Sequence, residues 1–197
     1  MTTKDPHSRR LYVSMAMSLD GFIEDKDHAL DWFDDQSPQF AQYCDEMIDA
    51  VGLAVFGRRS YDMMLAYWPN AEHHSTSPRD QAFARKMNAL PKVVLSRTLQ
   101  HAAWDNTRII NTDAATALSA LKREGGKPIV AWGGANLVTA LLNMRLVDEI
   151  RVLVHPVLLG KGTPLFSGLE NRIDLKLVRT TQLGANLSVL CFEPQWT

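Results

Sequence analysis

The sequence lacks several features that would place it in whole classes of protein. Its two cysteines, Cys44 and Cys191, are too few for a disulfide framework and are not spaced as metal ligands. It has no apolar run of about 18 residues, which a membrane-spanning helix would need. It contains neither a G-x-G-x-x-G fingerprint nor a Walker lysine motif. These absences argue against a disulfide-stabilised secreted module and a membrane span, and they favour the reducing cytoplasm.

Charge of one sign is also lacking. The 21 basic and 22 acidic side chains give a formal net charge of −1 at pH 7. Such a balance argues against charge-driven binding to nucleic acid or to a membrane surface. His73 and His74 are adjacent but have no third ligand at a suitable spacing, so we expect no metal site. Apolar residues, in contrast, make up 46% of the 197 residues, which is enough for a sizeable core.

Short β-rich runs alternate with amphipathic helical patterns along the chain. We predict strands at residues 11–17, 51–56, 92–95, 107–110, 128–131 and 149–154, and helices at about 38–50, 60–67, 114–122 and 136–143. This alternation predicts a three-layer α/β/α fold with a mostly parallel central sheet. Strands at 174–182 and 187–192 flank Gly184-Ala185-Asn186, which predicts a C-terminal antiparallel hairpin.

The polar segments predict how these elements are connected. We interpret residues 1–8 as a flexible N-terminal tail and residues 9–194 as a single domain. Trp68-Pro69 is expected to end a helix, because proline disfavours helical backbone in the residue before it. Residues 70–80 are then expected to form a polar loop, with a short helix at 80–87 after it.

One segment, residues 129–138, suggests a ligand site. An apolar strand stops at Gly133-Gly134, and a helical pattern begins at once. Glycines let a phosphate or a ring approach the backbone closely, and the free amides of a helix's first turn favour an anion. The alternative is that the two glycines only form a turn.

Two other strand ends have a similar character. Gly57-Arg58-Arg59-Ser60 combines a helix start with two guanidinium groups and a hydroxyl, and Ser96-Arg97 follows another strand. Ligands of open α/β sheets bind outside the carboxyl ends of the strands. We therefore expect the three strand ends to line one crevice, which would suit a nucleotide with several phosphates. The alternative for Arg58 and Arg59 is an exposed pair beside a helix cap.

In this order and spacing, the motifs resemble the dihydrofolate reductase-like fold. The closer resemblance is to the C-terminal reductase domain of the bacterial bifunctional riboflavin-biosynthesis protein. It is carried by residues 17–23, 57–61, 95–97, 132–134 and 152–166. It extends over about residues 9–193. No deaminase domain precedes it, so the chain resembles a stand-alone reductase.

The resemblance implies NADPH as the cofactor. Arg58 and Arg59 would face its 2′-phosphate or pyrophosphate, and Ser60 its pyrophosphate. Ser96 and Arg97 would hold the adenosine 2′-phosphate. The remaining cofactor-binding positions are Gly57, Gly133, Gly134 and Ala135. The fold often has a cis peptide bond between glycines here, and Trp132 stands at one candidate position.

The resemblance is weaker on the substrate side. Residues 29–33 resemble the Leu-Pro-Trp loop of dihydrofolate reductases, with Asp31 in place of the proline. A gap-free match puts Ser37 where those enzymes have their catalytic carboxylate. A serine cannot hold the charge that assists protonation of a pterin, which argues against true dihydrofolate reductase activity. Asp20 is the alternative acid, unless it only begins a tight turn before Gly21.

Three more residues are candidates for substrate binding. Trp32 is expected to stack on a flat heterocycle. Lys161 would pair with a ribose phosphate, or else it is a solvated side chain in a turn. His155 would touch the substrate, or else it fills the end of a strand before Pro156.

These inferences predict an NADPH-dependent oxidoreductase. Its substrate would be a pyrimidine- or pterin-like heterocycle or the ribosyl derivative of one, by resemblance to 5-amino-6-(5-phosphoribosylamino)uracil reductase. The alternatives are a nucleotide- or pterin-binding module without turnover and a true dihydrofolate reductase. We expect a small-molecule partner, no nucleic acid and no membrane. The family often pairs subunits through sheet edges or the hairpin, which suggests a homodimer.

Overall fold

The computed structural model describes residues 8–33 and 37–196 of the chain. Apart from Ser8, the predicted N-terminal tail lies outside the described residues. All the strands of the main sheet and the helices around it fall between residues 11 and 195. We keep the single domain over residues 9–194 as a proposal.

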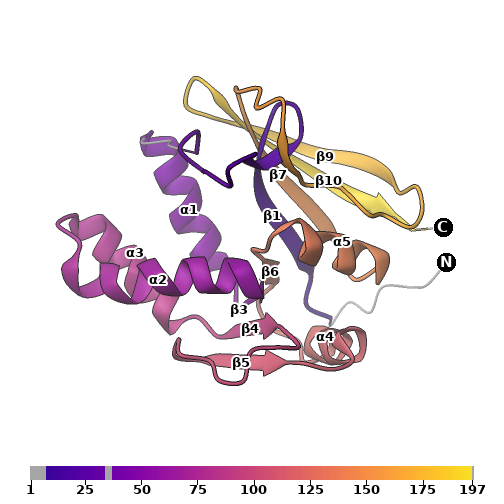
Figure 1. Cartoon of the computed structure of the whole chain (residues 1–197), viewed down its shortest axis with the longest axis horizontal. Coiled ribbons are helices and arrows are strands. Elements are labelled where there is room, and N and C mark those ends of the chain that lie inside the picture. Colours follow the sequence, from indigo (N-terminus) through magenta and orange to yellow (C-terminus); the bar gives the residue numbers. More distant parts are fainter. Residues whose placement is uncertain (1–7, 34–36, 197) are drawn as a thin grey trace.

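The centre of the molecule is an eight-stranded sheet (Figure 1). Its strands are β1 (Leu11–Ser18), β3 (Leu53–Gly57), β4 (Lys92–Leu95), β5 (Thr107–Ile110), β6 (Ile129–Ala131), β7 (Glu149–His155), β9 (Asp174–Leu183) and β10 (Leu187–Gln195). They lie in the order β5-β4-β3-β6-β1-β7-β10-β9. Neighbours from β5 to β7 are parallel, whereas β10 is antiparallel to both β7 and β9. The predicted mostly parallel sheet and C-terminal hairpin are confirmed.

Helices cover both faces of the parallel part. One face carries α1 (Pro38–Ala50), α2 (Arg58–His74) and α3 (Pro78–Ala89), and the other carries α4 (Ala114–Arg123) and α5 (Ala135–Asn143). Successive strand residues point to opposite faces, so Tyr12 and Phe56 pack with α1–α3, while Val13 and Val55 pack with α4 and α5. This division produces the predicted three layers. Within the described residues, no helix is long and apolar enough to cross a membrane.

The predicted end of a helix at Trp68-Pro69 is wrong. Helix α2 continues through Pro69 to His74, and only residues 75–77 separate it from α3. A proline inside a helix costs about 3 kcal/mol. Packing outweighs this cost, because Ala71 is buried and the Trp68 ring lies 5.1 Å from that of Phe83 on α3. Tertiary contacts have therefore replaced the predicted polar loop with helix.

A second, two-stranded sheet was not predicted. In it, β2 (Phe22–Asp25) pairs antiparallel with β8 (Gly162–Pro164). Gly162 has a φ of 156°, and a Cβ at this position would lie 2.0 Å from the carbonyl oxygen of Glu24. Only glycine permits so close an approach of the two strands. The pairing brings β2 beside the ends of β1 and β7.

An ion pair between the buried Asp148 and the partly buried Lys122 lies at the start of β1 and yields a first prediction. The Oδ2 atom of Asp148 accepts a hydrogen bond from the Leu11 N–H at 2.8 Å and one from Lys122 Nζ at 2.5 Å. We expect Asp148→Ala to lower the free energy of unfolding by about 2–3 kcal/mol, because it removes the acceptor of the buried Leu11 N–H and leaves the partly buried Lys122 ammonium with the Leu146 carbonyl but no carboxylate. Urea unfolding would measure the loss.

The matched control is Asp148→Asn. It keeps an acceptor for the Leu11 N–H and removes only the charge, so it should be destabilised less. A loss below about 1 kcal/mol in the alanine variant, as for an exposed ion pair, would contradict the assignment.

Candidate active site

Three of the predicted motifs follow the carboxyl ends of neighbouring strands. In the register of the parallel strands, Gly57 pairs with Leu95 and Val55 pairs with Ala131. Since β4, β3 and β6 are neighbours, the segments that follow them begin side by side at their carboxyl ends. The three strand ends are therefore neighbours along one rim, although only those after β3 and β6 line the cavity described below.

The starts of α2 and α5 lie together at this rim. Their N-caps are Gly57 and Gly134; in the part of the chain that the structure describes, no side chain caps either helix, and neither first turn contains an acidic residue. A Cβ on Gly134 would lie 3.9 Å from Ser60 Oγ, and one on Gly57 would lie 3.5 Å from Leu137 Cβ. Two sets of free amides and two positive helix ends therefore face the same space, which favours an anion.

A cavity of about 950 Å³ opens in front of these helix starts. Its wall includes the predicted cofactor-binding residues Gly57, Arg58, Arg59, Ser60, Gly133, Gly134 and Ala135, and the predicted substrate-binding residue Trp32. The volume is at the upper end of the range for small-molecule sites, which is about 300–1,000 Å³. The structure thus brings most of the predicted site residues together.

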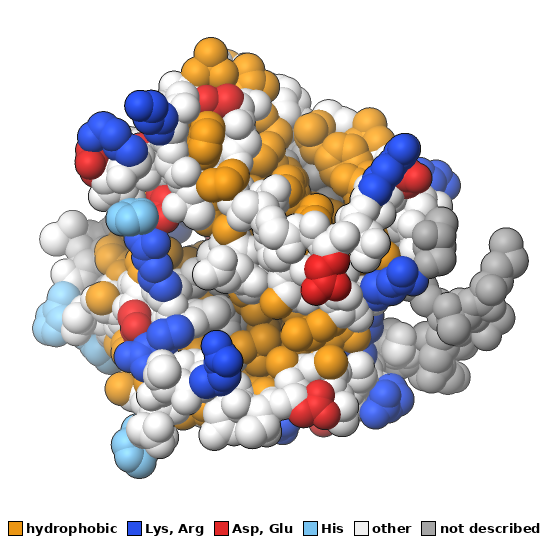
Figure 2. Space-filling model, turned by 45° about the vertical axis from the view of Figure 1, so that its right-hand side comes forward, with side chains coloured by type: hydrophobic (Ala, Val, Ile, Leu, Met, Phe, Trp, Pro, Cys, Tyr) orange, Lys and Arg blue, Asp and Glu red, His pale blue; other side chains and the backbone are white. Residues whose placement is uncertain are grey.

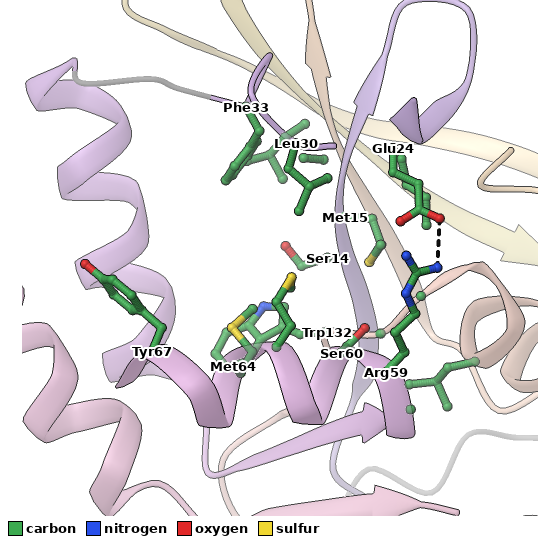
Figure 3. Close-up of a pocket in the computed structure, with 18 of the residues that line it drawn as sticks. Ser14, Met15, Glu24, Leu30, Phe33, Arg59, Ser60, Met64, Tyr67 and Trp132 are labelled. Atoms are coloured by element: carbon green, nitrogen blue, oxygen red, sulfur yellow. Dashed lines mark hydrogen bonds and ion pairs between the residues drawn. The ribbon is translucent and has the colours of Figure 1, made fainter. Parts of the chain in front are cut away.

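Both arginines at the rim are paired with carboxylates. Arg58 Nε donates to Asp62 Oδ2 at 2.6 Å, one helical turn away. Arg59 donates to Glu24 Oε1 at 3.0 Å, across the cavity from α2 to β2 (Figure 3). Each guanidinium is partly exposed, so an incoming phosphate would compete with a carboxylate for it.

Glu24 is a site residue that the sequence analysis missed. The residue is only 8% exposed and lines the cavity. Its Oε1 accepts hydrogen bonds from Thr163 Oγ1 at 2.5 Å and His28 Nδ1 at 2.8 Å, in addition to the one from Arg59. Burial acts to raise its pKa, but these hydrogen bonds and the Arg59 charge lower the pKa below its ordinary value of 4.5. Glu24 is therefore a carboxylate at neutral pH.

Asp20, the predicted acid, is not among the residues that line the cavity. Its Oδ1 accepts from Ser18 Oγ at 2.7 Å and from the Leu159 N–H at 3.1 Å, and its Oδ2 accepts from the Gly160 N–H at 2.7 Å. The hydrogen bonds from Ser18 and from these backbone N–H groups lower its pKa. These contacts favour the turn-forming alternative, and the proton-donor role stays a prediction.

Ser96 and Arg97 lie beyond the cavity wall, at the end of the adjacent strand β4. Ser96 is buried, and its Oγ accepts from the N–H groups of Thr98 at 3.3 Å and Leu99 at 3.1 Å. It therefore closes a turn that presents the exposed Arg97 at the rim. Their role in holding a 2′-phosphate stays a prediction.

The other substrate-side candidates lie outside the cavity lining. His155 is 5% exposed and lies behind the wall, its ring 5.2 Å from that of Trp32 and 5.0 Å from that of Phe33. Lys161 is exposed beside β8. Ser37 accepts from the Phe40 N–H at 3.2 Å and so caps α1. The described residues contain no cis peptide bond, at Trp132 or elsewhere.

One face of α2 forms much of the remaining wall. Ser60, Met63, Met64 and Tyr67 recur at helical spacing and all line the cavity. Figure 3 shows Ser60, Met64 and Tyr67 along this helix, with Phe33 and Leu30 opposite. The charged helix start and an apolar region therefore share one cavity.

Comparison with known proteins identifies the family of the chain. A family model described as the RibD C-terminal domain matches residues 9–189. The uncharacterized protein YyaP of Bacillus subtilis (strain 168) is 37% identical over 186 residues, which is 94% of this chain and 95% of YyaP.

Solved structures share the fold. A protein of Shewanella sp. PV-4 described as a riboflavin biosynthesis protein has a TM-score of 0.73 at 23% identity, covering 95% of this chain and 99% of its own. Dihydrofolate reductase from Enterococcus faecalis, complexed with NADP(H), has a TM-score of 0.57 at 12% identity, covering 94% of this chain and 96% of its own. The fold is therefore dihydrofolate reductase-like, as the resemblance implied.

The hydrogen bonds of Glu24 predict a pH dependence of stability. Because its folded pKa lies below the ordinary value of 4.5, they stabilise the fold above that pH, and the contribution is lost as pH falls through the folded pKa. We expect Glu24→Gln to cost about 1 kcal/mol at neutral pH and to lose less stability than the wild type in acid.

Urea unfolding at about pH 6 and about pH 3 would measure this difference. The control is Asp27→Asn, an exposed carboxylate in the turn that follows β2. Equal acid sensitivity of the wild type and Glu24→Gln would rule out the stabilising role of Glu24.

Proposed function

Because the chain belongs to the RibD C-terminal domain family, we propose that it is an NADPH-dependent reductase of a pyrimidine- or pterin-like heterocycle. The family is related to reductases of riboflavin biosynthesis. The observation that carries the cofactor assignment is the pair of uncapped helix starts beside Arg58 and Arg59. The NADP(H) complex of a dihydrofolate reductase with the same fold supports it.

The residues at the rim fit such a cofactor. The free amides of α2 and α5, with Ser60 Oγ, would hold the pyrophosphate. A Cβ on Gly133 would lie 2.2 Å from Leu137 Cδ2, so glycine is needed where the chain enters α5. Arg97 would take the 2′-phosphate at the end of β4, and Arg58 and Arg59 would neutralise the remaining charge.

The chemistry divides between cofactor and protein. NADPH, when bound, supplies the hydride. The protein's residues hold two flat molecules in register and exclude water: the phosphates at the helix starts, and the heterocycle between the apolar face of α2 and the loop that carries Trp32. Glu24 links β2 to β8 through Thr163 and contributes a carboxylate to the cavity wall.

A binding module without turnover remains the second candidate. The observation in its favour is that Ser37 caps α1, where dihydrofolate reductases have a catalytic carboxylate. The same observation argues against true dihydrofolate reductase activity. Loss of NADPH absorbance with a panel of pterins and pyrimidines would separate turnover from binding alone.

The NADPH site can be tested by adding a charge to a helix start. We expect saturable NADPH binding by the wild type, followed by fluorescence or calorimetry. Ser60→Asp should weaken it at least about tenfold, or 1.4 kcal/mol, because the new carboxylate in the first turn of α2 repels the pyrophosphate. Ser60→Ala, the matched control, removes only the hydroxyl and should weaken binding less than Ser60→Asp does. An absence of saturable binding by the wild type would refute the proposed cofactor.

We also propose that two copies of the chain pair through the edge strand β9. Leu175, Leu177 and Val178 on this strand are all exposed, Leu177 by 53%. Figure 2 shows that hydrophobic side chains are exposed on one face of the molecule, both in its upper part and near its centre. An exposed apolar edge strand favours pairing with another chain.

Light scattering after size exclusion would test this pairing. The wild type should have twice the mass of the chain, and Leu177→Lys should have the mass of one chain, because a lysine on the edge opposes strand pairing. Leu158→Lys, at another exposed leucine, is the control. A monomeric wild type would exclude the dimer.

The remaining partners that we propose are small. The balanced net charge supports neither nucleic acid nor a membrane surface as a partner. Both cysteines are free thiols, which supports the cytoplasm as the compartment.

A further inference from the structure

The cavity has a charged end and an apolar end. Arg58, Arg59 and the helix starts form the charged end. The apolar end is lined mainly by Phe33, Phe40, Tyr43, Met63, Met64 and Tyr67. Figure 3 shows the separation, with Arg59 at one end of α2 and Tyr67 toward the other.

Large apolar side chains are exposed at the apolar end. Phe33 is 39% exposed, Met63 47% and Tyr67 52%, and all three line the cavity. Exposed apolar groups gathered in a concave surface indicate a ligand that covers them. Aromatic rings and thioethers pack well against a flat ring.

Cationic groups for a second phosphate are scarce at this end. Among the described residues that line this end, Arg79 at the start of α3 is the only arginine or lysine. Arg79 Nε lies 3.7 Å from Asp45 Oδ2, and Asp80 is also in the wall. A phosphate here would compete with Asp45 for the one guanidinium and would meet the carboxylate of Asp80 in the wall. Lys161, predicted to bind a ribose phosphate, is not in the wall.

The arginines at the rim are close to the apolar end, but the phosphates of the proposed cofactor would occupy them. At a rise of about 1.5 Å per residue, Met63 and Tyr67 lie about 6 Å and about 12 Å along α2 from Arg59. Arg79 follows the far end of α2, and Arg58 and Arg59 stand at its beginning. A phosphate on the substrate could use the rim arginines only by competing with the cofactor for them.

Neutral hydrogen-bonding groups are present at the apolar end. The indole N–H of Trp32 is buried, and it has no acceptor in the described parts of the chain. Tyr43 also lines the cavity, and its hydroxyl is likewise buried without a partner among the described residues. Such groups suit a ring carbonyl or ring nitrogen, because a buried donor without an acceptor is costly.

We propose that the substrate is an uncharged, planar heterocycle with a ring carbonyl and no phosphate group. This inference rests on the proposed reductase function, and it selects the free heterocycle or nucleoside over the phosphoribosyl compound. Each turnover adds a hydride from NADPH and a proton from solvent to one C=N bond, either in the ring of a pterin or between the ring amine and C1′ of an opened ribosyl group, and leaves NADP⁺. The substrate therefore differs from that of the phosphoribosyl reductases in charge.

Matched compounds test the inference. Pterin, a ribosylaminouracil and the 5′-phosphate of the same ribosylaminouracil would be titrated calorimetrically into the protein, with and without NADP⁺. We expect the ribosylaminouracil to bind at least about tenfold more tightly than its phosphate, with the same order in kcat/KM for NADPH oxidation. Tighter binding of the phosphate overturns the inference.

Two variants sharpen the result. Met63→Glu should weaken binding of pterin at least about tenfold, because it puts a charge against the ring; Leu158→Glu, at an exposed leucine elsewhere, is the control. Arg79→Gln should leave the ratio of the two ribosylaminouracil affinities as it is. A loss confined to the phosphate would show that Arg79 reads it, and would overturn the inference.

The same experiments distinguish a failure of the proposed reductase function from a failure of this inference. If NADPH does not bind, the reductase assignment is lost, whereas titrations without NADP⁺ still report which compound the apolar end accepts. If NADPH binds and only the phosphate is reduced, the reductase assignment stands and the inference falls.

Discussion

The site depends on one constraint, the adjacency of two parallel strands that each lead directly into a helix. Because β3 and β6 are neighbours, α2 and α5 start side by side, and glycine N-caps leave the amides of both first turns free of side-chain caps. An N-terminal side-chain cap is worth about 1 kcal/mol to a helix. Because neither α2 nor α5 has such a cap, positive potential is concentrated where the two helices start. The arginines, Glu24 and the cavity are arranged around this point.

Much of this arrangement could be predicted from local patterns. The strands and their glycine-rich ends are encoded in short segments, and parallel alternation brings those ends to one edge. The continuation of α2 past Pro69 depends on packing against α3, and the pairing of Phe22 with Pro164 joins remote segments. Glu24 is inconspicuous in the sequence, since its partner Thr163 is 139 residues away.

Asp20 had two interpretations because contacts between remote segments are not visible in the local sequence. An aspartate before a glycine can begin a turn or serve as an acid, and neighbouring residues do not distinguish the two. Its bonds to the N–H groups of Leu159 and Gly160 favour the turn, and they come from the far end of the chain. The wall formed by α2 differs from Asp20, because the spacing of Ser60, Met63, Met64 and Tyr67 is visible in one short stretch of sequence. The rise of the helix then sets how far apart two molecules bound along it can lie.

The position of β1 has a consequence for how the protein is made. This strand comes first in the chain but lies between β6 and β7, so its partners end at His155 of 197 residues. On the ribosome, β1 emerges long before the strands that flank it, and parallel pairings between distant segments form slowly. The apolar residues of β1 must therefore wait, exposed or protected by a chaperone, until most of the chain has been synthesised.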